Sequence, residues 1–75
     1  MTPVQCRMAR AALGWNTQDL AREADVGGNT VNRFEAGQDA RLSSVEKMRK
    51  ALEKGGVQFI PENGGGVGVR LKDRS

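Results

Sequence analysis

The sequence contains no histidine and only one cysteine, Cys6, among its 75 residues. It therefore lacks the common ligands of protein metal sites and most of the side chains that act as general bases or nucleophiles. A single cysteine also excludes an internal disulfide, and secreted chains of this size usually carry an even set of cysteines. The composition argues against an enzyme and against any cofactor, and it favours a reducing, cytoplasmic location.

Aromatic residues and long apolar runs are also scarce. Only Trp15, Phe34 and Phe59 are aromatic, and no apolar run is long enough for a membrane span or a secretory signal. A chain this short buries only about 60% of the surface that its unfolded form exposes. We expect one small domain with a thin core, no membrane association, and added stability from dimerisation.

The net charge is +3, which suits a polyanionic partner. Positive and negative residues are nevertheless mixed along the chain, so charge alone does not identify a function.

Capping residues predict the first two helices. Thr2–Gln5 has the pattern of a capping box, and we expect a helix from Pro3 to Leu13 that Gly14 ends in the left-handed conformation. Asn16–Asp19 has a second such pattern, which predicts a short helix over Thr17–Ala24.

Two more helices and a hairpin follow. A third helix is expected from Gly28 to Ala36, and Ser43–Glu46 has the pattern of a capping box that opens a fourth helix ending at Lys54. Beyond Gly56 the apolar period changes to that of strands, over Val57–Ile60 and Val67–Leu71. We therefore predict a helical domain over 1–56, a β-hairpin over 57–72 and a disordered tail over 73–75.

Residues Thr17–Phe34 have the pattern of a helix-turn-helix. Ala21 is small where two helices approach closely, and Asp25 tolerates the left-handed conformation that the turn requires. Apolar residues occupy the core-facing positions Leu20, Ala24, Val26, Val31 and Phe34. This arrangement leaves one face of the third helix free to enter a DNA major groove.

Three stretches resemble the Cro and phage-repressor (XRE-type) family of regulators: Leu13–Asn16, Asp19–Ala21 and Thr30–Gly37. The ending, Gly56–Leu71, is similar to short bacterial members in which a β-hairpin replaces the fifth helix. The resemblance implies a mainly α, lambda-repressor-like fold of four helices with a C-terminal hairpin.

The resemblance also implies the contacts to DNA. Arg33 is expected to take guanine O6 and N7 together, and Asn29 to pair with adenine. The base-contacting set is Gly28, Asn29, Asn32 and Arg33. The phosphate-contacting set is Asn16, Thr17, Thr30, Gln38, Arg41, Ser43 and Ser44.

Two departures from the family pattern bear on specificity. The family usually has glutamine at Thr17 and a side-chain-bearing residue at Gly27 or Gly28. We therefore expect the third helix to begin without a good cap and to read fewer bases at its start.

Two further contacts are expected within the helical domain. The resemblance suggests an ion pair between Arg10 and Glu35, the alternative being two separately solvated charges. Trp15 is interpreted as a core residue behind the turn rather than as a platform for stacking bases.

The hairpin is the candidate contact of a homodimer. Its apolar residues exceed what a monomeric hairpin needs, and they form the expected interface of Val57, Phe59, Val67, Val69 and Leu71. Positive residues near the end, Arg70, Lys72 and Arg74, are either a second DNA contact or a charged edge that resists pairing.

We therefore expect a sequence-specific, homodimeric regulator of transcription, a repressor, that reads double-stranded DNA. Two-fold symmetry predicts a palindromic operator with half-sites about 10 base pairs, or roughly 34 Å, apart. The alternative is an antitoxin-like or accessory module that binds a protein partner and contacts DNA weakly, which Gly27 and Gly28 favour. Single-stranded or RNA binding is disfavoured because the chain lacks a series of aromatic residues.

Overall fold

The computed structural model describes residues 1–62 and 64–72. In chain order the elements are α1 (Pro3–Leu13), α2 (Thr17–Ala24), α3 (Gly28–Glu35), α4 (Leu42–Lys54), β1 (Val57–Ile60) and β2 (Gly68–Leu71). The expected mainly α architecture of four helices followed by a two-stranded antiparallel hairpin is confirmed at this level. The tail expected to be disordered, 73–75, lies outside the described residues.

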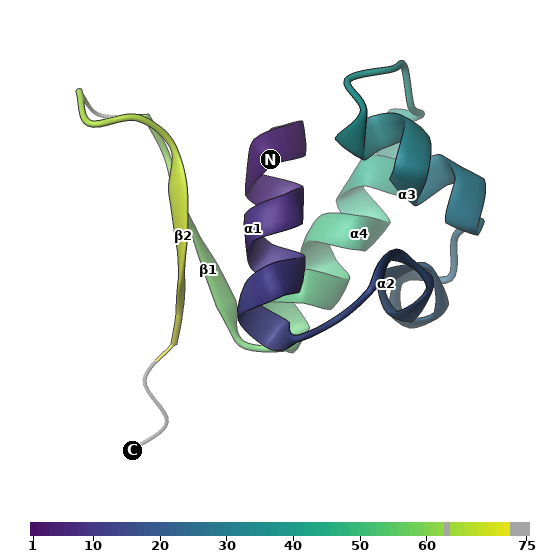
Figure 1. The fold of residues 1–75 in the computed structure, drawn as a ribbon, viewed down its shortest axis with the longest axis horizontal. Helices are drawn as coiled ribbons and strands as arrows, with labels where there is room; N and C mark the ends of the chain where they lie inside the picture. The colour runs from purple at the N-terminus through teal and green to yellow at the C-terminus, as the bar shows by residue number, and fades with distance from the viewer. Residues whose placement is uncertain (63, 73–75) are drawn as a thin grey trace.

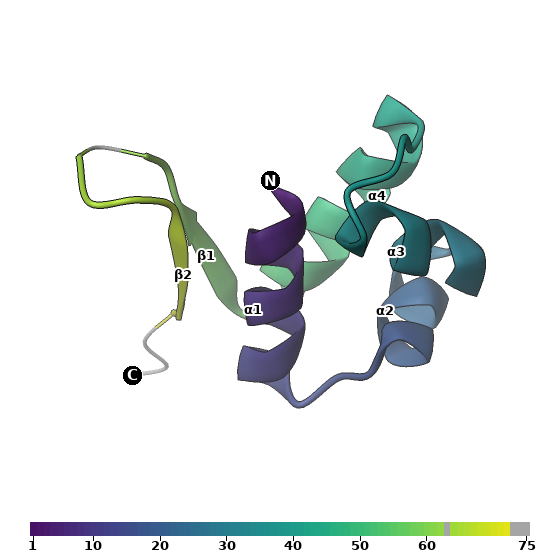
Figure 2. The ribbon, with the colours of Figure 1, turned by 45° about the horizontal axis from the view of Figure 1, so that its top comes forward.

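The helix α1 lies between the hairpin and the other helices (Figures 1 and 2). The hairpin occupies one end of the longest axis, and α2 and α3 occupy the other (Figure 1). The Cα extents are 32 × 29 × 18 Å. Over the part of the chain that the structure describes, no helix has both the length and the apolar character needed to cross a membrane.

Both N-terminal capping boxes are confirmed. The Gln5 amide donates to Thr2 Oγ1 over 3.1 Å, and the Thr2 amide donates to Gln5 Oε1 over 2.9 Å. The reciprocal bonds between Asn16 and Asp19 are 2.7 and 3.0 Å long. Gly14 ends α1 with φ of 70°, in the left-handed region, as expected.

The fourth helix begins differently from the prediction. It starts at Leu42 with Arg41 as its N-cap, and no side chain caps it. The Val45 amide already donates to the Arg41 carbonyl over 3.0 Å, so Ser43 lies within the first helical turn and cannot cap from outside it. The predicted box at Ser43–Glu46 is therefore wrong, and Leu42 is left 86% exposed.

The core forms where the four helices and β1 meet. Met48 and Leu52 of α4 are fully buried at its centre, and the other members are Cys6, Ala9, Leu20, Ala21, Ala24, Val31, Phe34, Ala51 and Val57. Trp15 packs against this cluster, which confirms its interpretation as a core residue. A Cβ at Gly55 would lie 2.9 Å from Leu13 Cδ1 and 3.2 Å from the Trp15 ring, so close packing there requires glycine.

The hairpin contributes to this core as well as covering it. Val57 is 0% exposed, and Phe59 and Val69 pack partly buried against the helices. Val57 is therefore a residue of the protomer's own core, and its assignment to a dimer interface is corrected, because a side chain without exposed area cannot reach a partner. Leu71, in contrast, is 53% exposed.

The buried side chain of Gln5 hydrogen-bonds both strands of the hairpin to α1. Gln5 Nε2 donates to the carbonyl of Ile60 in β1 and to the carbonyl of Gly68 in β2, each over 3.1 Å. Because the Gln5 Oε1 atom also completes the capping box of α1, the whole amide is hydrogen-bonded. The angle between α1 and the hairpin therefore depends on this residue.

An ion pair fixes α1 to α3 at the other side. Arg10 Nε and Nη2 donate to the two carboxylate oxygens of Glu35, each over 2.8 Å. The Cys6 thiol also donates to Glu35, over 3.2 Å, and burial together with this carboxylate raises the thiol pKa to about 12. The expected ion pair is confirmed, and Cys6 is a protonated core residue.

Stability should fall in acid as this ion pair is lost. Burial raises the pKa of Glu35, but hydrogen bonds from Arg10 and Cys6 outweigh it, and the net pKa lies below the ordinary 4.5. The pair therefore contributes fully above pH 4.5, and its contribution is lost as the pH falls through the lower, folded-state value. Urea unfolding between pH 7 and pH 3 should show a steeper loss for the wild type than for Glu35→Gln.

The exposed carboxylate of Glu46, which pairs with Arg49, provides the control. Glu35→Gln should cost about 2–3 kcal/mol at pH 7. Glu46→Gln should cost much less and change the acid slope far less, because solvent screens its exposed pair with Arg49. Equal acid slopes for the wild type and Glu35→Gln would contradict this account of the ion pair.

Candidate functional site

A tight turn joins α2 to α3. Asp25 adopts the left-handed conformation, with φ of 57° and ψ of 49°, as its residue type allows. The Val26 amide donates to the carbonyl of Ala21 over 3.0 Å, which closes the end of α2. Ala21 and Ala24 are buried, so their small side chains let α3 approach α2 closely. The two short helices therefore pack against each other and against α4 as one unit.

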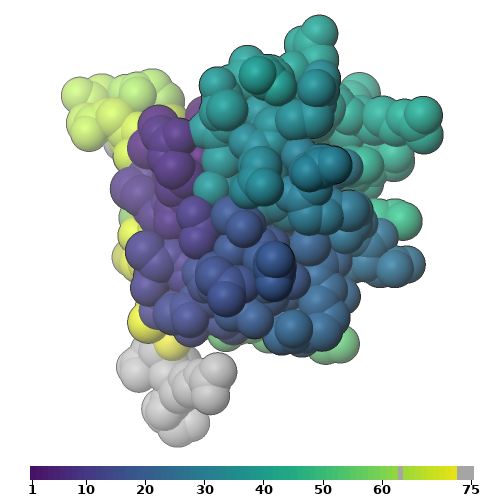
Figure 3. All heavy atoms as spheres, turned by 45° about the vertical axis from the view of Figure 1, so that its right-hand side comes forward, coloured from purple at the N-terminus to yellow at the C-terminus, as the bar shows by residue number. Residues whose placement is uncertain are grey.

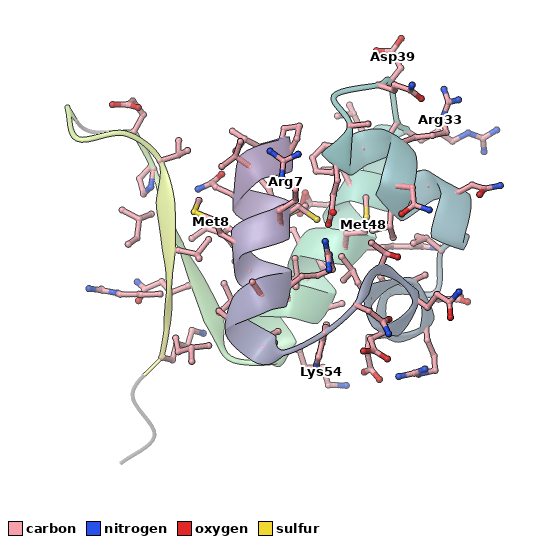
Figure 4. The ribbon with its side chains drawn as sticks, viewed as in Figure 1. Arg7, Met8, Arg33, Asp39, Met48 and Lys54 are labelled. Carbon is pink, nitrogen blue, oxygen red and sulfur yellow. The ribbon has the colours of Figure 1, made fainter. Side chains whose placement is uncertain are left out.

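The helix α3 has one buried side and one exposed side. Val31, Phe34 and Glu35 face the interior, whereas Asn29, Asn32 and Arg33 are exposed. Gly28 and Thr30 are partly buried. Figure 3 brings the side of the molecule with α2 and α3 forward, and Figure 4 shows Arg33 pointing away from the body. The outer face of α3 thus carries amides and a guanidinium, groups that can donate and accept hydrogen bonds.

Side chains from α1 hold the C-terminal end of α3. Arg7 Nη1 donates to the backbone carbonyl of Glu35, beside the ion pair between Arg10 and the same residue. Positive charge at a helix C-terminus is favourable because the last carbonyls have no partner in the helix. Both arginines therefore fix the position of α3 relative to α1.

The N-terminal end of α3 has no comparable anchor. Gly27 is the N-cap and supplies no side-chain hydrogen bond, as expected from its residue type. A Cβ built at Gly28 would meet nothing within 4 Å. The backbone at the start of α3 is thus open to close approach by a ligand surface.

A hollow of about 400 Å³ adjoins α3. It brings together residues of α3, the following loop and the start of α4: Thr30, Arg33, Asp39, Ala40, Arg41 and Ser44. Four of these, Thr30, Arg33, Arg41 and Ser44, were expected at the site. Gln38 and Ser43 are exposed and lie on the same loop and helix start. Two guanidinium groups, two hydroxyl groups and the uncapped start of α4 can together contact an anion.

Asp39 is a residue of this hollow that the sequence reasoning missed. No periodicity or capping pattern distinguishes it, because it lies in the polar connection between α3 and α4. Its carboxylate lines the same hollow as Arg33 and Arg41, and Figure 4 shows Asp39 and Arg33 at the same end of the molecule. This negative charge opposes the binding of an anion in the hollow.

The start of α2 is less open than expected. Asn16 and Thr17 lie there, but the Asn16 side-chain oxygen is occupied by the Asp19 amide. The Asn16 amide and Arg22 bond to the Asp19 carboxylate and lower its pKa. A charged carboxylate therefore already neutralises part of the positive end of this helix.

On the expectation that the chain binds DNA, removing the charge of Asp39 should strengthen its binding to a nucleic acid duplex. Asp39→Asn should tighten binding to duplexes of random sequence about two- to fivefold at low salt, with a smaller gain at 0.3 M salt, because exposed charges are screened. Fluorescence anisotropy with a labelled duplex measures this.

Glu62→Gln is the matched control, since it removes one negative charge from the connection between β1 and β2, at the far end of the molecule. An equal gain from both variants would mean that net charge, not the hollow, governs binding.

The sequence was compared with models of known protein families and with curated proteins, and neither comparison gives a match. Membership of the Cro and phage-repressor family therefore stays a prediction from the residues quoted above.

Proposed function

We propose that this protein binds double-stranded DNA with sequence specificity, as a helix-turn-helix regulator in which α2 and α3 form the motif. The observation that carries the proposal is the division of α3 into two sides. Its inner side is buried against the core through Val31, Phe34 and Glu35, while Asn29, Asn32 and Arg33 stand exposed on its outer side. A helix whose inner side is packed on the core and whose outer side is polar matches the width and chemistry of a major groove.

Base reading is assigned mainly to two residues of α3. Arg33 is exposed and can donate two hydrogen bonds to the O6 and N7 atoms of guanine, while the Asn29 amide can pair with the N6 and N7 atoms of adenine. Each such pair discriminates against a wrong base by about 1–3 kcal/mol. Asn32 faces the same side and contacts adjacent bases. Gly28 supplies no side chain, and it allows the start of α3 to lie close to the DNA.

Phosphate contacts are assigned to the hollow beside α3. Arg41, Ser44 and Thr30 line it, and Gln38 and Ser43 lie exposed next to it. Contacts of this kind set the register of the helix on the duplex and carry no sequence information. Asn16 and Thr17, at the start of α2, hold the opposite backbone of the groove more weakly, because Asp19 shares that helix end.

The regulator acts as a homodimer and represses transcription by occupying its operator. Two-fold symmetry of the protein then requires a palindromic site, with half-sites separated by one helical turn or a multiple of it.

Selection of bound duplexes from a random pool, at about 0.15 M salt, tests the proposal. The wild type should enrich a palindromic motif, and Arg33→Ala should lose preference at one guanine in each half-site, by about 5- to 150-fold. Lys54→Ala is the control, since it removes the same charge at the far end of α4, away from Arg33 (Figure 4). It should enrich the wild-type motif.

Failure to enrich any motif, with equal weak binding by all three proteins, would favour the protein-interaction module instead. Salt separates the two functions further. Binding through several phosphates weakens steeply between 50 and 200 mM salt, whereas binding to a protein through apolar surface does not.

A further inference from the structure

We infer that the open edge of β2 pairs with the β2 strand of a second copy, in an antiparallel register centred on Val69. The two hairpins then form one four-stranded sheet. This interface specifies the homodimer of the proposed function, but it does not require that the protein bind DNA.

The alternation of hydrogen-bonded and non-bonded residue pairs in the hairpin shows which backbone amides and carbonyls of β2 face the open edge. The strands pair Val57 with Leu71 and Phe59 with Val69, and the Lys72 amide donates to the Gly56 carbonyl over 2.7 Å. In an antiparallel pair, bonded and non-bonded pairs alternate, so Gly68, Arg70 and Lys72 direct their backbone groups toward β1. The amides and carbonyls of Val69 and Leu71 therefore point outward. Figure 1 shows β2 in front of β1, with this edge toward the viewer.

Charge selects one register among those that the outward groups allow. If the two-fold axis passed through Arg70, this residue would face its own copy, and if it passed through Leu71, Arg70 would face Lys72 of the second copy. Like charges directly opposite each other are destabilising. An axis through Val69 instead places Arg70 opposite Gly68 of the second copy, where no side chain or charge opposes it.

The same register also covers apolar side chains of the hairpin. Phe59 and Val69 already pack on the core, but Leu71 is 53% exposed and Val67 is only partly buried. With the axis at Val69, Leu71 lies opposite Val67 of the second copy, on the face of the sheet that covers α1. The exposed side of Leu71 thus gains a cross-strand neighbour in the dimer, at two symmetric points.

The resulting dimer has the symmetry that operator binding needs. The axis that relates two neighbouring antiparallel strands of one sheet runs perpendicular to the sheet, so both copies place their helices on the same side of it. Since α3 lies at the end of the longest axis opposite the hairpin, both α3 helices face away from the shared sheet in the same direction (Figure 1). A pairing of sheet faces would instead point them in opposite directions.

Substitutions at Gly68 test this register. A Cβ there would meet only Ile60 Cδ1, at 3.9 Å, so the position accepts a side chain. Gly68→Glu places a negative charge opposite Arg70 of the second copy at two symmetric points, and Gly68→Lys places a positive one. Sedimentation equilibrium should show the dimer dissociation constant falling roughly tenfold for Gly68→Glu and rising roughly tenfold for Gly68→Lys.

The double variant Gly68→Lys, Arg70→Glu places opposite charges at the same two points, so it should reverse the loss caused by Gly68→Lys and dimerise about as tightly as Gly68→Glu. In a register centred on Arg70, residue 68 would face Lys72, and the second substitution would restore nothing. Thermal unfolding of each variant at a concentration below dimerisation checks that the protomer is intact.

A wild type that stays monomeric at high micromolar concentration would overturn the inference. A dimer that is insensitive to all three variants would also overturn it, since the contact would then lie elsewhere. Neither result depends on DNA, so failure of this interface is distinguishable from failure of the proposed function.

Discussion

The paired contacts of Arg10 with Glu35 are the interaction on which the arrangement of the molecule depends. Glu35 is buried at the last turn of α3, where an isolated carboxylate would be costly, and both of its oxygens are bonded to one guanidinium of α1. The proposed reading face is on the same short helix, and α3 has no cap at its start. The orientation of that face is therefore determined by α1 and by the core beneath α3, not by the helix itself.

The helix α1 also carries the hairpin, which gives it a second role. The Gln5 amide joins both strands to the first turn of α1, and Arg10 joins its last turns to α3. One helix thus sets the position of the proposed dimer edge relative to the proposed DNA-reading face. The chain has only 75 residues, and its core consists mostly of small side chains. In larger domains apolar packing alone can fix how the elements are oriented, whereas here these buried polar contacts help to fix it.

Much of this structure could be predicted from the sequence, where local chemistry determines it. Thr2, Asn16 and Asp25 have side chains suited to caps or to left-handed turns, and each lies where its chemistry indicates. The start of α4 was placed wrongly, because Ser43 and Ser44 suit a cap by type, while the backbone becomes helical one residue before them. Val57 was assigned to a dimer interface, although it follows α4 by three residues and is buried in the core. Tertiary packing determines both positions, and local sequence patterns carry no information about tertiary packing.

The candidate site divides in the same way. The exposed residues of α3 follow from helical periodicity once Val31 and Phe34 are assigned to the core. Their assembly with Arg41 and Ser44, and the presence of Asp39 among them, depend on how the loop after α3 folds back to α4. Two acidic groups, Asp19 and Asp39, lie among the proposed DNA contacts, and both should lower the affinity for DNA of any sequence. When the attraction to phosphates is weak, binding depends more on contacts to the bases, and this favours sequence specificity.

The most direct test of the central claim is a titration of isotope-labelled protein with a short duplex, followed through the backbone amide resonances. If α3 reads DNA, the largest shifts should fall on residues 16–18, 28–33 and 38–44, while the amides of α1 that face the hairpin, around Met8, stay unchanged. Shifts concentrated in the hairpin, or none at duplex excess and low salt, would contradict the claim that α3 and its flanking loop form the binding surface.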